Sequence, residues 1–150
     1  MSKTPKLLIL YYSQTGNTEK MAEAIEEGAK SVSGVNVELR YFAKSEELAK
    51  ADGIILGMPT YHHDMGMDMK RLLEEVAIKK INLKGKIGAT FGSYGWSGEA
   101  PRMLLEIMKN KFEIETIEPP LLAKYSPDQR SLKECRKSGK TVAERIRKKV

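Results

Sequence analysis

The sequence of 150 residues contains a single cysteine, Cys135. One cysteine cannot form an intramolecular disulfide or hold an iron–sulfur cluster, and it is compatible with a reducing compartment. Any redox chemistry must therefore come from a bound cofactor. Cys135 also falls on the apolar stripe of a predicted C-terminal helix, which indicates a core residue and argues against a thiol phosphatase.

Long apolar runs are missing as well. No run approaches the roughly 20 residues that a membrane-spanning helix needs. The first residues, 1–5, lead directly into an apolar stretch and show no small-residue cleavage site. We therefore expect a cytoplasmic protein without a membrane partner. The length and the ordinary contents of 41% hydrophobic and 31% charged residues predict one globular domain over residues 1–150.

The excess of positive charge lies at one end of the chain. The net charge is +6, but residues 124–150 contain ten Lys or Arg against three Asp or Glu, so that residues 1–123 sum to −1. Such a run on a terminal helix is typical of a solvated face, or of a docking surface for an acidic partner or nucleic acid. The near-neutral remainder of the chain argues against nucleic acid as the main partner.

Five short segments rich in β-branched or aromatic residues alternate with helical patterns. This order is typical of an α/β fold in which helices cover both faces of a parallel sheet. Gly139 lies inside the last helical pattern and predicts a bend or a frayed end there. The expected strands are residues 6–12, 35–42, 53–57, 86–92 and a segment within 112–117, and the expected helices lie around residues 21–32, 69–77, 100–108 and 132–146.

The loop after the first strand contains only polar residues and glycine. It opens onto a helix N-terminus, where unpaired N–H groups and the positive end of the helix dipole favour an anion. It lacks the Lys-Ser or Lys-Thr pair of a triphosphate-binding loop and the glycine fingerprint of a dinucleotide site, so it suits one phosphate monoester. The alternative is a turn that caps only the helix. The residues of this loop are Ser13, Gln14, Thr15, Gly16, Asn17 and Thr18.

The run Ser13-x-Thr15-Gly16-x-Thr18 after an opening apolar strand resembles the phosphate-binding signature of flavodoxins. The resemblance covers essentially the whole chain, whose length is similar to that of short-chain members. It implies a flavodoxin-like, doubly wound sheet of five parallel strands in the order 2-1-3-4-5. It also implies one non-covalently bound FMN and electron transfer between redox proteins.

Flavodoxins hold the isoalloxazine ring between the loops after strands three and four. The loop at residues 92–98 resembles its counterpart in the flavodoxin module of A-type flavoproteins, which implies that Trp96 covers one face of the ring and that Tyr61 stacks or lies at its edge. Alternatively, Trp96 is a packing residue and Tyr61 anchors its loop. The resemblance assigns to the cofactor Pro59, Thr60, Tyr61 and His62 from one loop, and Ser93, Tyr94, Gly95, Trp96 and Gly98 from the other.

His62 departs from the family pattern, because many flavodoxins have glycine after the aromatic residue of this loop. A side chain at this position implies a weakly populated one-electron-reduced state. His62 and His63 are adjacent and lack metal-ligand spacing, so no metal site is expected.

Two functions remain open from the sequence. The first is an electron carrier with redox-protein partners, present as a monomer or weak homodimer. The second is a small FMN-dependent NAD(P)H:quinone-type reductase, which is less favoured because the sequence shows no separate nicotinamide-binding segment. A phospho-acceptor of similar topology is rejected, because Tyr12-Ser13 and Gly57-Met58 stand where acidic residues would be needed.

Overall fold

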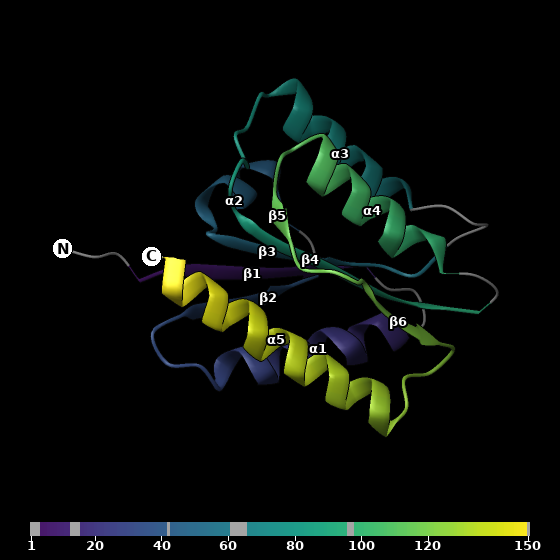
Figure 1. The fold of residues 1–150 in the computed structure, drawn as a ribbon. Coiled ribbons are helices and arrows are strands. Elements are labelled where there is room, and N and C mark those ends of the chain that lie inside the picture. The colour runs from purple at the N-terminus through teal and green to yellow at the C-terminus, as the bar shows by residue number, and fades with distance from the viewer. Residues whose placement is uncertain (1–3, 13–15, 42, 61–65, 96–97, 150) are drawn as a thin grey trace.

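A computed structural model describes residues 4–12, 16–41, 43–60, 66–95 and 98–149 (Figure 1). Strands and helices alternate along the chain, as the sequence predicts. In chain order the elements are β1 (Lys6–Tyr11), α1 (Asn17–Lys30), β2 (Asn36–Arg40), α2 (Ser45–Lys50), β3 (Gly53–Gly57), α3 (Met67–Ile78), β4 (Ile87–Tyr94), α4 (Glu99–Asn110), β5 (Glu115–Thr116), β6 (Leu121–Lys124) and α5 (Gln129–Lys149).

All strand pairs in the sheet are parallel, and the order β2-β1-β3-β4-β5 confirms the predicted topology. The fifth position is shared by two short strands. Ile87 and Gly88 at the start of β4 pair with β5, whereas residues 91–94 at its end pair with β6. The sequence expectation placed the last strand within residues 112–117 and was wrong in omitting β6.

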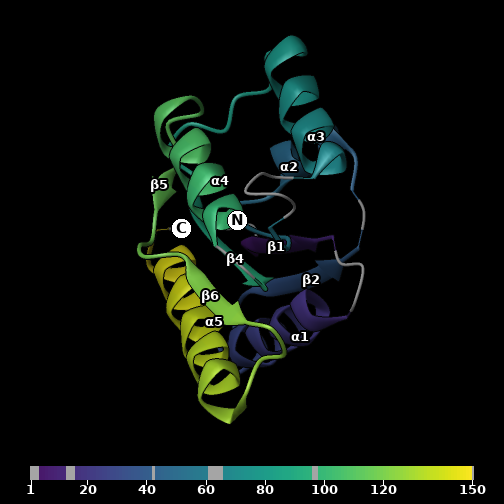
Figure 2. The same cartoon turned by 90° about the vertical axis from the view of Figure 1, so that its right-hand side faces the viewer.

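Side chains of the central strands alternate between two hydrophobic layers, because successive residues of a strand point to opposite faces. Leu8 and Leu10 of β1 join the layer under α3 and α4, whereas Leu7 and Ile9 join the layer under α1 and α5. Figures 1 and 2 show these helix pairs on opposite sides of the sheet. The predicted helices on both faces are thus confirmed.

Helices α1 and α5 approach closely at two glycines. A Cβ on Gly28 would lie 1.8 Å from the carbonyl oxygen of Arg136, and a Cβ on Gly139 would lie 2.0 Å from the carbonyl oxygen of Ile25. Both distances are shorter than any van der Waals contact, so only glycine permits this crossing. Gly139 is therefore a packing residue inside α5, which continues to Lys149, so the expected frayed end is wrong.

Helix α2 has only six residues, and the sequence analysis missed it because Leu48 is the one large apolar side chain that it buries. No helix in the part of the chain that the structure describes is long and apolar enough to cross a membrane.

Candidate functional site

The carboxyl ends of three strands meet at one edge of the sheet. The register aligns Tyr11 of β1 with Gly57 of β3, and Gly57 with Phe91 of β4. The strand order reverses at β1, which lies between β2 and β3. Ligands of doubly wound sheets bind at such a switch point. Figure 2 views the molecule from the side to which these strands point.

Gly16 stands directly before α1 in a left-handed conformation, with φ of 86°. Glycine adopts this conformation without the steric cost that a Cβ brings. No described atom outside its chain neighbours lies within 4 Å of the place that a Cβ on Gly16 would take. Together with the N-terminus of α1, which begins at Asn17, Gly16 leaves room for an anion to approach the backbone.

Thr18 and Ser93 connect the first loop to the end of β4. Thr18 is 0% exposed and Ser93 is 4% exposed, and their hydroxyl oxygens lie 2.9 Å apart. The backbone N–H of Ser93 also donates to Oγ1 of Thr18 at 3.4 Å. The sequence predicts both residues as cofactor-binding, and the structure brings them together as each other's partners.

Ser93 is also joined to the loop after β3. Its carbonyl oxygen accepts a hydrogen bond from the N–H of Thr60 at 3.3 Å. Oγ1 of Thr60 in turn accepts from the N–H of Ala100 in the first turn of α4, at 3.1 Å. The predicted residues Pro59 and Thr60 therefore lie beside the end of β4, and Ser93 links all three loops.

The loop after β4 is backed by β6. The carbonyl oxygen of Tyr94 accepts a hydrogen bond from the N–H of Tyr125 at 2.6 Å. A Cβ placed on Gly98 would lie 3.2 Å from Cδ1 of Leu122 in β6. The predicted residues Tyr94 and Gly98 thus lie beside β6, and Gly95 directly follows Tyr94.

Several predicted residues fall on segments that the structure does not describe. These are Ser13, Gln14, Thr15, Tyr61, His62 and Trp96, and their assignment remains a prediction.

Tyr11 and Tyr12 lie at the carboxyl end of β1, and the sequence analysis assigned neither of them to the site. Burial, followed by the hydrogen bond to Glu19, raises the pKa of Tyr11 to about 12. Burial and the charge of Asp68 raise the pKa of Tyr12 to about 12. The Tyr11 hydroxyl donates a hydrogen bond to Oε2 of Glu19 at 2.9 Å. This bond joins the end of β1 to the first turn of α1.

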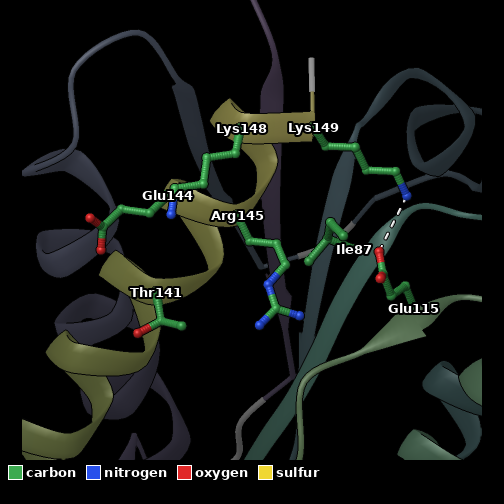
Figure 3. Close-up of a pocket in the computed structure, with 7 residues that line it drawn as sticks. All are labelled: Ile87, Glu115, Thr141, Glu144, Arg145, Lys148 and Lys149. Carbon is green, nitrogen blue, oxygen red and sulfur yellow. Dashed lines mark hydrogen bonds and ion pairs between the residues drawn. The ribbon is translucent and has the colours of Figure 1, made fainter.

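A separate groove of about 540 Å³ lies at the opposite end of the molecule, where β4 begins (Figure 3). Its one marked ion pair joins Lys149 and Glu115 at 3.3 Å. Because it lies at the amino ends of the strands, we do not assign it to the cofactor. The groove is lined by Ile87, Glu115, Thr141, Glu144, Arg145, Lys148 and Lys149.

The described residues contain no group of three or more His, Cys, Asp or Glu side chains that could hold a metal ion. Cys135 is buried, which confirms its predicted place in the core, and burial raises the pKa of its thiol to about 12. The thiol is therefore protonated at neutral pH and unreactive.

The parallel strand order 2-1-3-4-5, with helices on both faces of the sheet, defines a doubly wound α/β protein of flavodoxin-like topology. The family model "Flavodoxin" matches residues 9–139. The chain belongs to the flavodoxin family, whose members bind FMN.

Individual relatives agree with this membership. The chain is 38% identical over 146 residues to a type A flavoprotein of Rhodobacter capsulatus, covering 93% of this chain and 33% of that protein. It is 38% identical over 90 residues to a flavodoxin of Clostridium saccharobutylicum, covering 59% of this chain and 55% of the relative. The chain thus spans between a third and about half of these relatives. The solved structure of a flavodoxin from the domain Archaea superposes with a TM-score of 0.87 at 38% identity, covering 95% of this chain and 99% of the other.

Proposed function

We propose that this chain binds one FMN non-covalently and carries electrons between redox proteins. The observation that carries the proposal is the convergence of the three loops at the switch edge, where Ser93 bonds to Thr18 on one side and to Thr60 on the other. Membership of the flavodoxin family supports it.

The residues of this edge fit FMN. Residues 13–18 contain no charged side chain, and Gly16 leaves open the space that a Cβ would fill. These features suit a phosphate monoester held by backbone N–H groups and hydroxyls at a helix N-terminus. The loops after β3 and β4 would hold the ring, with Tyr61 and Trp96 as its aromatic neighbours. FMN bound there would supply the redox chemistry, which no side chain of the protein provides.

The protein's own residues position the loops. The buried pair Thr18 and Ser93 fixes the first turn of α1 against β4, and Thr60 fixes the loop after β3 against α4. An electron carrier needs no separate substrate pocket, because the bound FMN would supply the redox chemistry. We infer that its partners are redox proteins and that it is a monomer or weak homodimer.

The first experiment is to purify the protein and identify its flavin. We expect about one FMN per chain, released by acid and distinguished from FAD by chromatography, because the first loop accommodates one phosphate monoester. A protein that contains FAD, or that takes up no flavin after reconstitution, would contradict the proposal.

A second measurement separates the carrier from the reductase. The protein is first titrated anaerobically with a chemical reductant while its absorbance is followed. Reduced nicotinamides are then tested as direct electron donors, with a quinone as the acceptor. Slow, substoichiometric oxidation of nicotinamide is expected for a carrier. Rapid oxidation over many turnovers would favour the NAD(P)H:quinone-type reductase.

A further inference from the structure

Helix α5 begins with positive charge where the helix dipole disfavours it. The partial charge at a helix N-terminus is positive, so acidic side chains are stabilising there and basic ones are not. The first turn of α5 contains no acid, whereas Arg130 lies within this turn and Lys133 follows it. Helix stability therefore does not explain why Arg130 and Lys133 occupy these positions.

Arg130, Lys133 and Lys137 lie on one face of α5. Spacings of three and four residues place them about one turn apart on the same side of the helix, and all three residues are exposed. Like charges at this spacing repel one another. We call these three residues the basic surface of α5.

The basic surface is not neutralised by neighbouring acids. Among the residues that the structure describes, none of its three side chains forms an ion pair. Exposed cations elsewhere do: Lys79 pairs with Glu46 at 2.6 Å, and Lys109 pairs with Glu118 at 3.2 Å. Proteins break the rules of local stability mainly at functional sites, so the unpaired charges indicate a binding surface.

The basic surface lies toward the switch edge. Lys124, the last residue of β6, pairs with Tyr94 at the end of β4, and residues 125–128 connect β6 to α5. Figure 1 shows the first turns of α5 at the end of the molecule to which β4 and β6 point, and its last turn at the opposite end. A protein docked on the first turns of α5 would therefore lie at the flavin end of the molecule.

We propose that the basic surface of α5 is a docking surface for an acidic redox protein. The proposal rests on the proposed function, because it requires that electrons pass from FMN at the switch edge to another protein. Carboxylates of that protein would supply the ion pairs that this chain does not make. Opposite charges on two proteins also steer their encounter and raise the rate of association.

The acids near the basic surface favour a protein partner over nucleic acid. Asp128 precedes the helix, and its pKa is lowered mainly by the hydrogen bond from the N–H of Ser131, with a smaller contribution from Arg130. Glu134 is exposed and lies one turn from both Arg130 and Lys137. A phosphate backbone is negative throughout and would be repelled by these carboxylates, whereas a protein can place a neutral or basic group opposite them.

The same helix provides a matched control. Lys140, Arg145 and Lys148 are exposed and lie on average about 16 Å further along α5, at a rise of 1.5 Å per residue. This separation exceeds the Debye length of about 8 Å at physiological ionic strength. The switch-end variant is Arg130→Gln/Lys133→Gln/Lys137→Gln, and the far-end variant is Lys140→Gln/Arg145→Gln/Lys148→Gln. Each lowers the net charge from +6 to +3, so they differ only in where the charge is lost.

The first measurement is electron transfer to a rubredoxin of acidic isoelectric point, which serves as the probe. The FMN-loaded proteins are reduced with dithionite, freed of excess reductant and mixed with the probe by stopped flow. Each rubredoxin takes one electron, which converts its Fe(III) to Fe(II), so that one fully reduced FMN reduces two rubredoxins and releases its protons to solvent. At low ionic strength we expect the switch-end variant to react about tenfold more slowly than the wild type, and the far-end variant to stay within about twofold.

The second measurement is zero-length carbodiimide cross-linking of the wild type to the same rubredoxin, which needs no flavin. Mass spectrometry should find the joined lysines at Lys133 and Lys137 rather than at Lys140 and Lys148. Binding of a labelled DNA duplex, measured by fluorescence anisotropy at the same ionic strength, should be weaker than binding of rubredoxin.

Four outcomes would overturn the proposal. They are a wild-type rate that does not fall with added salt, an equal loss of rate in the two variants, cross-links mainly in the C-terminal half of α5, and tighter binding of the duplex than of rubredoxin. If the wild type takes up no flavin, the proposed function itself has failed. The cross-linking map would still test the docking surface, so the two failures are distinguishable.

Discussion

Thr18 and Ser93 lie 75 positions apart in the sequence, yet their hydroxyl groups share a buried hydrogen bond. A valine at position 18 would keep the shape of threonine but leave the hydroxyl and the N–H of Ser93 without this acceptor. Buried polar groups that lose their partner destabilise a fold more than an ordinary hydrogen bond stabilises it.

Thr18→Val should therefore lower the free energy of unfolding by about 1–3 kcal/mol, as measured by urea denaturation of the flavin-free protein. Thr141→Val is the matched control, because the exposed Thr141 hydroxyl bonds to the carbonyl oxygen of Lys137 in its own helix. The double variant Thr18→Val/Ser93→Ala should cost less than the sum of the single changes. Equal effects at positions 18 and 141 would contradict this account.

At the scale of single residues, the sequence could predict only those features of the site that depend on neighbouring residues in the chain. The polar loop at residues 13–18 pointed to an anion because its composition and its place before a helix are local properties. The hydrogen-bonded partner of Thr18 is not local, since it depends on how α1 and β4 meet.

At the scale of elements, the crossing of α1 and α5 sets a strict limit on side-chain size. Alanine is favoured over glycine in an exposed helix interior by about 1 kcal/mol. At position 139, however, the added Cβ would lie 2.0 Å from the backbone oxygen of Ile25, which no side-chain rotation can relieve. For Gly139→Ala, the steric clash with the backbone of Ile25 should therefore outweigh the gain in helix propensity.

We therefore expect Gly139→Ala to lower the free energy of unfolding by about 1–3 kcal/mol, measured by denaturant titration. Lys140→Ala, one residue further along on the exposed face, is the control and should change stability by less than about 0.5 kcal/mol. A stabilised Gly139→Ala variant would show that the helices can separate at little cost.

Elements were predictable where local pattern and burial coincide. Residues 53–57 form β3 with the predicted bounds, because a buried central strand is apolar throughout. Strand β6 has four residues and helix α2 has six, too few for a periodic pattern to emerge. Both depend on tertiary packing, which the sequence pattern does not report.

At the scale of the whole molecule, the basic residues on the C-terminal half of α5 are separated from the proposed flavin site. Helix α5 runs back along the sheet, so that Ile146 packs against Gly53 at the start of β3 and Lys149 donates to the carbonyl oxygen of Gly85. The C-terminal half of α5 therefore lies at the amino ends of the strands, away from the switch edge.

Replacing Lys140 and Lys148 together by glutamine should change FMN affinity by no more than about twofold, because both lie in the C-terminal half of α5 and solvent and salt screen distant charges. Arg147 is left in place, since it donates to the carbonyl oxygen of Ser33 at 3.2 Å. Weaker retention on a cation-exchange column would verify the lost charge, and titration with FMN would measure affinity. A large loss of FMN binding would show that α5 contributes to the site.

The divided fifth position of the sheet bears on how copies of the protein behave at high concentration. An open sheet edge with a long row of unpaired backbone groups invites strand addition and aggregation. Here one edge is broken into β5 with two residues and β6 with four, and the other edge, β2, carries Glu38 and Arg40, with Glu38 paired to Lys6 at 2.8 Å. The short strands at one edge offer few backbone groups for pairing, and the charged side chains at the other edge disfavour an added strand. Both features should oppose aggregation through the sheet edges.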